Sequence, residues 1–271
     1  MGSLRSAASI PGNWIAYLGR GLLTILQELG GIFIFFLRAL VAIFRYPFQV
    51  ERIVQQTFFI GAKSVFLIAV VGLFSGMVLS LQGYYSLARF GSEGVLGGVV
   101  ALSLIRELGP VLTAIMIVAR AGSAMSAEIG IMRITEQIDA LFTMGVDPVR
   151  TLVSPRIVAA VLSFPLLTAL FDAIGILGGY VTGVILLNIN SGIFLTQMDS
   201  LVVLSDVLNG FYKSLAFGLL VVTICCYQGF YVHTRHGGHG AKGVSLATTS
   251  AVVYSCVGIL ISDYVLTSLL M

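Results

Sequence analysis

Long apolar stretches separated by short polar segments dominate the sequence. A helix needs about 20 residues to cross the hydrocarbon core of a bilayer. No stretch alternates apolar and polar residues with a period of two, as the strands of a membrane barrel do. Since backbone polar groups inside hydrocarbon must pair with one another, these stretches are predicted to be transmembrane helices. Five of them are expected, near Phe58–Leu81, Val95–Ala119, Ile157–Leu187, Asn209–Val232 and Leu246–Met271.

The stretch Trp14–Arg45 is also apolar but carries basic and amide side chains. Those that share one helical face are Arg20, Gln27, Arg38 and Arg45. A basic stripe on an apolar helix favours a segment that lies in the membrane interface, and a sixth, poorly formed span is the alternative. The predicted architecture is therefore all-α, with an N-terminal interfacial region (residues 1–54) and a transmembrane domain (residues 55–271).

Composition supports a membrane protein and excludes several other classes. Hydrophobic residues make up 58% of the chain and charged residues 10%, whereas soluble domains have about 25% charged residues. An ordinary soluble enzyme, a disordered tail and a disulfide-rich module are therefore excluded. A net charge of +3 without a basic run gives no support for nucleic acid as a partner.

The distribution of Lys and Arg predicts the orientation in the membrane. Basic residues precede the first span and lie between spans two and three and between spans four and five, and the other connections are poor in them. Cytoplasmic loops carry an excess of Lys and Arg. The N-terminus and the loops at about 120–156 and 233–245 are therefore expected on the cytoplasmic side, and the C-terminus on the opposite side.

Charged residues inside the predicted spans are the first candidates for function. Arg106 and Glu107 lie near the middle of the second span, where a charge costs at least about 2.5–3.5 kcal/mol. As neighbours on a helix they point in different directions and should not pair with each other, and Pro110 should kink the helix nearby. The candidate partners are Lys213, Asp172 and Asp263. A structural ion-pair network is favoured for the two aspartates, while structure and function both stay open for Arg106 and Glu107.

The stretch Ala127–Arg150 predicts an amphipathic helix in a cytoplasmic loop. Its apolar residues at helical spacing are Ile131, Ile134, Ile138 and Leu141, and its polar ones are Arg133, Glu136, Gln137 and Asp139. Arg133 could pair with Glu136 or Gln137, and Gly145 is expected to end the helix. Such a helix could lie on the membrane or dock into a cytoplasmic partner. The pattern Asp139-Ala140-Leu141…Gly145 is similar to the loop by which ABC permeases engage their ATPase.

The end of the first span and the segment after it are apolar and aromatic with one amide. The residues concerned are Leu79, Gln82, Tyr84, Leu87 and Phe90. They would suit lipid acyl chains, with Gln82 and Tyr84 near a polar head. They could equally form an aromatic belt at the interface, and composition alone favours the belt.

No motif predicts catalysis by this chain. It lacks the phosphate-binding loop of ATPases, the paired histidines of zinc proteases and the serine elbow of hydrolases. We therefore expect no catalytic residues, no metal site and no nucleotide bound through such a loop.

Several runs of residues are distinctive when taken together: Gly76–Tyr84, Ala101–Val111, Ala119–Gly130, Met132–Gln137, Val146-Asp147-Pro148, Ser154-Pro155-Arg156, Lys213-Ser214 and Asp263–Thr267. These runs resemble the MlaE/YrbE permeases, the membrane subunits of bacterial ABC systems that maintain outer-membrane lipid asymmetry. The resemblance covers about residue 55 to the C-terminus.

This resemblance implies a homodimer of five-span subunits in the bacterial inner membrane that transports glycerophospholipids. The implied partners are a cytoplasmic ABC ATPase dimer, which binds the ATP and Mg, a small STAS-domain protein and a periplasmic hexamer of MCE-domain subunits. Met132–Phe142 would be the ATPase-coupling helix, and the residues at the end of the first span would line the lipid pocket. Arg106 and Glu107 match the family's intramembrane charged pair.

Two other classes of function compete with this interpretation. An ATPase-independent secondary carrier or channel could use Arg106, Glu107 and Lys213 as an ion relay. A lipid-modifying enzyme is disfavoured because no paired catalytic groups are found.

Overall fold

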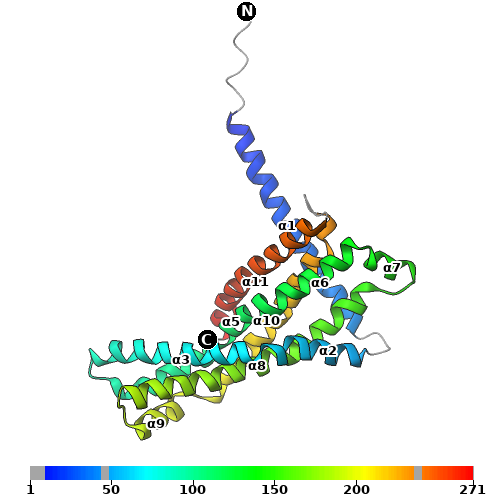
Figure 1. The fold of residues 1–271 in the computed structure, drawn as a ribbon. Coiled ribbons are helices and arrows are strands. Elements are labelled where there is room, and N and C mark those ends of the chain that lie inside the picture. Colours follow the sequence, from blue (N-terminus) through cyan, green and yellow to red (C-terminus); the bar gives the residue numbers. More distant parts are fainter. Residues whose placement is uncertain (1–9, 44–48, 235–239, 271) are drawn as a thin grey trace, which may run out of the picture.

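The computed structural model describes residues 10–43, 49–234 and 240–270, and all regular structure in these ranges is helical (Figure 1). The α-helices of the first half are α1 (Ile10–Ile43), α2 (Val50–Ile60), α3 (Val65–Ala88), α4 (Leu96–Ser103), α5 (Gly109–Ile117), α6 (Ser123–Ile134) and α7 (Gln137–Thr143). The second half has α8 (Ser154–Tyr180), α9 (Ser191–Leu201), α10 (Leu204–Phe230) and α11 (Gly240–Leu270).

Short 3-10 and π segments join several of these helices. The 3-10 segments are η1 (Ala62–Ser64), η2 (Glu93–Val95) and η7 (Val232–Thr234). The π segments are η3 (Leu104–Leu108), η4 (Val118–Gly122), η5 (Val149–Val153) and η6 (Val181–Leu186). Within the described ranges, six helical runs are long and apolar enough to cross a membrane. The all-helical prediction is confirmed.

The second predicted span ended too early. The helical run that contains it extends from Glu93 to Ile134, beyond the expected end at Ala119. Charges that lower local hydropathy are satisfied inside the protein and do not stop the helix. Arg120 donates to Ser64 Oγ at 2.8 Å and to the carbonyl oxygen of Phe59. The loop between the second and third spans is therefore much shorter than the predicted 120–156.

The other spans lie where they were expected, with shifted ends. α3 continues to Ala88, seven residues past the predicted end at Leu81. The connection expected at 188–208 contains a helix of its own, α9, which Asn190 caps by accepting from the backbone N–H groups of Gly192 and Ile193. Of the loop expected at 233–245, residues 235–239 lie outside the described residues.

The N-terminal segment forms one helix, α1, with two different faces along its second half. Phe35, Ala39 and Ala42 are buried, and the carbonyl of Ala39 accepts from Ser154 Oγ at 3.1 Å. The opposite face exposes apolar side chains, among them Leu29 and Phe33. The window Leu26–Ile43 meets the same length and hydropathy criteria as the five other spans. On the predicted basic stripe, Gln27 and Arg38 are exposed. The side chain of Arg20, and Arg45 altogether, lie outside the described residues.

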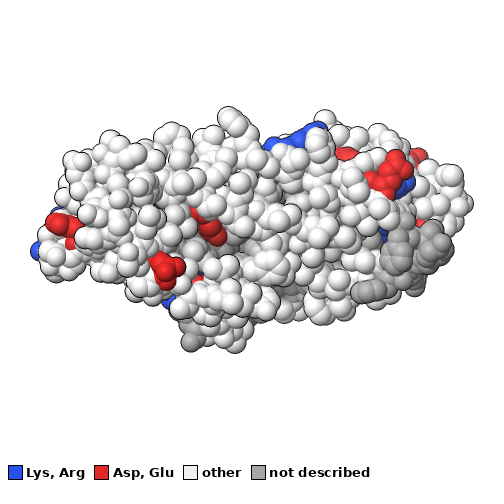
Figure 2. All heavy atoms as spheres, turned by 90° about the horizontal axis from the view of Figure 1, so that it is seen from below, with Lys and Arg blue, Asp and Glu red and all other residues white. Residues whose placement is uncertain are grey.

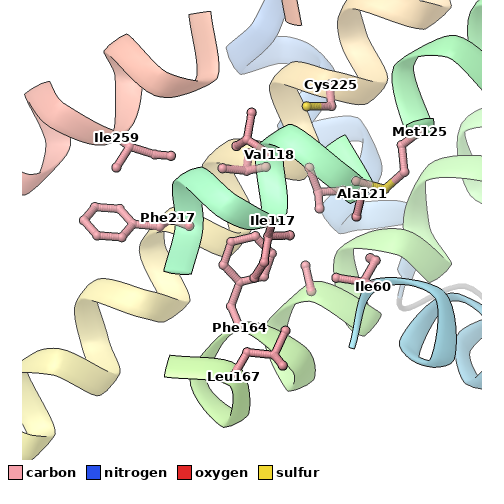
Figure 3. Close-up of a cluster of buried hydrophobic side chains, with 14 of the residues drawn as sticks. Ile60, Ile117, Val118, Ala121, Met125, Phe164, Leu167, Phe217, Cys225 and Ile259 are labelled. Atoms are coloured by element: carbon pink, nitrogen blue, oxygen red, sulfur yellow. The ribbon is translucent and has the colours of Figure 1, made fainter. Parts of the chain in front are cut away.

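The core is built around α8, which lies beside α3 on one side and α10 on the other (Figure 1). Phe164 of α8, Phe217 of α10 and Ile117 of α5 are fully buried in one cluster (Figure 3). Against α3 the contact is between backbones, because Gly76 faces Gly175 without side chains between them. Gly72 and Gly76, four residues apart on α3, thus let the backbones of α3 and α8 approach closely.

The surface is mostly uncharged, as a lipid environment requires. Figure 2 shows small, separate groups of charged side chains on an otherwise uncharged face. Large apolar side chains are exposed on α3, α8 and α11, for example Phe66, Leu166 and Tyr264. In water such a surface would be a strong aggregation hazard. The fold is thus that of a multi-pass membrane protein.

Candidate functional site

A π turn directly before Pro110 positions the charged residues of the second span. Gly109 N–H pairs with the carbonyl of Leu104, five residues back, and Pro110 has no N–H to donate. The carbonyl of Arg106, four residues before Pro110, instead accepts from Lys213 Nζ of α10 at 2.9 Å. The disruption predicted at Pro110 therefore takes the form of a π turn, a feature often found at functional sites.

Lys213 is the centre of an intramembrane ion-pair cluster. Its ammonium lies 2.7 Å from Glu107 Oε2 and 3.1 Å from Asp263 Oδ1. It also donates to Thr267 Oγ1 at 2.8 Å, so its three N–H bonds are used by Arg106, Glu107 and Thr267. Lys213 is almost fully buried, at 3% exposure. Of the candidate partners, Lys213 pairs with Glu107, and Asp263 belongs to the same ion-pair network through Lys213 and not through Arg106.

Arg106 has a partner that the sequence analysis missed. Its guanidinium lies 2.5 Å from Asp206 Oδ1, and Asp206 is buried. The other oxygen of Asp206 accepts from the backbone N–H of Val203 at 3.1 Å, at the start of α10. Asp206 was assigned to a loop because the span was expected to begin at Asn209. An acidic residue in the first turn of a helix is the signal that could have found it.

The expectation of an ion-pair network around Asp172 is wrong. In the part of the chain that the structure describes, Asp172 has no ion pair, because Arg106 and Lys213 are taken by other carboxylates. Its Oδ1 is buried without a hydrogen bond. It occupies the space that a side chain at Gly109 would fill.

The predicted cytoplasmic helix is broken into two pieces. α6 ends at Ile134, and α7 begins at Gln137 after Glu136, which has a left-handed backbone with φ 61°. Ile131 is consequently exposed on α6, whereas Ile138 of α7 is buried. The expectation of one continuous helix over Met132–Phe142 is therefore wrong. The predicted stop at Gly145, with φ 74°, is confirmed.

Arg133 ties the end of α6 to α7 and to the segment after α10. It lies 2.6 Å from Asp139 Oδ1, a pairing made possible by the break, in place of the predicted Glu136 or Gln137. Its Nε donates to Nδ1 of His233 at 2.9 Å, and its guanidinium lies over the Phe230 ring. The exposed residues of this loop are Thr135, Glu136, Gln137, Asp139, Ala140, Phe142, Thr143, Met144, Gly145, Val146 and Asp147.

The contact between His233 and Arg133 should depend on pH. Partial burial and the charge of Arg133 lower the pKa of His233 from its ordinary 6.5, so the unfolded chain binds the proton more readily. The contact is complete above pH 6.5 and is lost as the pH falls through the lowered value, since imidazolium cannot accept from Arg133. We expect the amides of α7 to exchange hydrogen faster at about pH 5.5 than at about pH 7.5, relative to those of α9. His233→Asn, which keeps an acceptor but does not titrate, should abolish this difference. A difference that persists in this variant would contradict the assignment.

The five residues predicted to line a lipid pocket do not lie on one face. Gln82 and Phe90 are exposed, and Phe90 lies in the turn after α3. Leu79, Tyr84 and Leu87 pack partly buried against the core. Their role in binding lipid stays a prediction.

The fold and these sites define a multi-pass helical membrane protein with a buried charge cluster and an exposed loop helix, the class of membrane-embedded permeases. Comparison with known families gives a match to the family described as Permease MlaE over residues 53–269. The chain belongs to this family. It is similar to the intermembrane phospholipid transport system permease protein MlaE of Haemophilus influenzae, with 40% identity over 95% of this chain and 97% of that protein.

Two other relatives show how widely the family occurs. A probable ABC transporter permease protein of Rickettsia bellii is 43% identical over 93% of this chain and 95% of its own length. The chloroplastic protein TRIGALACTOSYLDIACYLGLYCEROL 1 of Arabidopsis thaliana is 37% identical over 79% of this chain and 60% of its own length.

Proposed function

We propose that this chain is the membrane subunit of an ABC transporter that moves glycerophospholipids between the bacterial inner membrane and a periplasmic MCE-domain carrier, and so maintains outer-membrane lipid asymmetry. The observation that carries the proposal is α7 and the turn after it, which present Ala140 and Met144 to solvent while Arg133 holds α7 to the spans. An exposed apolar helix fixed on a rigid support is suited to dock into a groove of a partner.

In this assembly the chain forms a homodimer, and a partner subunit hydrolyses the ATP. A cytoplasmic ABC ATPase dimer binds ATP and Mg and grips α7. A STAS-domain protein and a periplasmic MCE-domain hexamer complete the complex. The chain itself binds phospholipid and no cofactor, and lipid occupies the region of Leu79, Gln82, Tyr84, Leu87 and Phe90.

In the membrane, the N-terminus and α7 face the cytoplasm and the C-terminus faces the periplasm. The basic residues concentrated near one side support this orientation. α1 lies in the cytoplasmic interface, which its direction supports, since α1 runs at a steep angle to α3 and α8 (Figure 1).

Mechanically, ATP binding draws two copies of α7 together. α10 carries Lys213 and Asp206 at the charge cluster, and its end lies beside Arg133 and α7. Movement at α7 is therefore transmitted along α10 to the cluster as a rigid-body shift, and it reaches the lipid region through α8, which contacts both α10 and α3.

Ala140→Arg tests the docking of α7. Ala140 is exposed on α7, so the variant should fold normally, while the long cationic side chain blocks entry into the ATPase groove. We expect at least a roughly tenfold loss of co-purifying ABC ATPase and of lipid transfer, the size of effect that a central interface residue has. Ser92→Arg, at an exposed turn after α3, is the matched control. Recovery of the ATPase equal to that of the control would contradict the proposal.

The charge cluster gives one reason to keep a second candidate, a carrier that works without an ATPase. Lys213 has two carboxylate partners, so the cluster could exchange a proton. Purified chain alone in liposomes would then move lipid under a proton gradient, whereas the proposed permease is inactive there.

A further inference from the structure

A pocket of ≈ 540 Å³ lies between the second half of α1, the loop helix α7, the segment leading into α8 and the end of α10. This volume is within the range of sites that bind small molecules. Its walls are mainly apolar, and Phe35, Phe230 and Tyr231 form an aromatic cluster in them, with the Phe35 and Phe230 ring centroids 5.7 Å apart. None of the five residues predicted to bind the transported lipid lines it.

Arg38 gives this apolar pocket one available positive charge. It lines the pocket and is exposed, and it forms no hydrogen bond or ion pair within residues 10–43, 49–234 and 240–270. The other charged lining residue, Asp147, stays negative, but its Oδ1 is directed at its own turn, where it accepts from the backbone N–H of Val149 at 3.0 Å. The unsatisfied charge thus favours an anion, and the guanidinium fork is well suited to phosphate.

The surroundings of the pocket indicate that this anion carries an apolar chain. Leu37 and Val41, which also line it, are largely exposed on α1. Beside a membrane-spanning bundle, such a surface faces lipid, not water. A site with one cationic residue and apolar walls matches an amphiphile, because a free phosphate would leave those walls uncovered.

We propose that this pocket binds one anionic phospholipid from the leaflet that α1 contacts, with its phosphate on Arg38 and an acyl chain along Val41 and Phe142. The site is separate from the transport site, since α7 and the end of α3 lie at opposite ends of the molecule (Figure 1). Phe142 belongs to α7, so a bound lipid braces the loop helix against α1 and α10. The proposal rests on the membrane location of the chain and does not require the ATPase.

Photo-crosslinking of the purified full chain tests this site. The probe is phosphatidylglycerol with a diazirine in one acyl chain, present as a minor component of phosphatidylcholine nanodiscs. We expect crosslinked peptides from α1, α7 and the end of α10, in addition to any from the end of α3. Arg38→Glu should lower the labelling of these peptides at least tenfold, whereas Arg89→Glu, at an exposed arginine after α3, should leave it unchanged.

A second variant tests the apolar part independently. Val41→Trp, at a pocket residue that is 57% exposed, should fill the space and lower the same labelling without affecting folding. Labelling of the pocket peptides that neither variant changes would mean general contact with bulk lipid, and would overturn the proposal. Competition by inorganic phosphate would show a site for a soluble anion, and loss of labelling only when the ATPase is bound would assign the surface to that partner. Either result would also overturn it. None of these readouts depends on lipid transfer. The experiment therefore tests the pocket independently of the proposed transport function.

Discussion

Lys213→Ala should destabilise the protein by about 3–5 kcal/mol and abolish lipid transfer, because breaking a buried ion pair leaves uncompensated charge. The lysine ammonium pairs with Glu107 and Asp263 and also donates to the carbonyl of Arg106. Its loss leaves two carboxylates without a counter-ion inside a membrane span. The measurements are the yield of monodisperse protein and its thermal unfolding temperature in mild detergent, together with lipid transfer in the reconstituted complex.

Lys242→Ala is the matched control, since Lys242 is exposed on α11 and its loss should change little. Equal stability of the two variants would show that the cluster does not hold the spans together. The triple variant Lys213→Met, Glu107→Gln, Asp263→Asn removes all three charges, and folding should largely recover. If this variant also transports lipid fully, the charges serve packing alone. If it folds but does not transport, they act in the transport cycle.

Gly76→Ala should be nearly as damaging, although it adds a single methyl group. A Cβ at this position would lie 1.8 Å from the carbonyl oxygen of Gly175 and 2.6 Å from its carbonyl carbon. Backbone atoms cannot rotate away, so α3 and α8 must separate. Separation also endangers the hydrogen bond from Ser80 Oγ to the carbonyl of Gly179 at 3.0 Å. We expect a loss of about 3 kcal/mol, the upper end for overpacking, measured as a lower unfolding temperature and lower yield.

Gly30→Ala controls for the effect of alanine itself. Gly30 is a helical residue of α1 with nothing within 4 Å of the position of a Cβ. Alanine favours helix by about 1 kcal/mol over glycine, so this variant should be as stable as the parent or slightly more so. If Gly76→Ala were as stable as the parent, the result would contradict the backbone contact between α3 and α8 at Gly76.

The parts of the fold that hydropathy controls could be predicted from the sequence. Burial of apolar surface and the need to pair backbone groups in lipid placed five spans near their observed positions. Hydropathy averaged over a span did not reveal the role of Asp206, since a single carboxylate beside apolar residues looks like the edge of a loop. Arg120 also looked like the end of a span, because sequence alone does not show that Ser64 and Phe59 accept its hydrogen bonds.

The loop helix shows a different limit of the sequence analysis. Its stop at Gly145 was predictable, because glycine adopts positive φ at little cost. The break at Glu136 was not, because a left-handed glutamate has no sequence signal and is held there by the contacts on either side. Arg133 reaches Asp139 of α7 because of that break. The position of the loop helix was thus predicted correctly, but its shape could not be derived.

The π turns η3 and η4 also change how the run from Leu96 to Ile134 must be read. Each inserts one surplus residue into the helical repeat, which advances the phase of everything that follows by about 100°. A single helical wheel drawn through this run would therefore place the residues after η3, and again those after η4, on the wrong face of the helix. Deleting one residue at either π turn would restore a regular α-helix there. The part of the span after the deletion would then turn about its axis, while the helices around it stay in place.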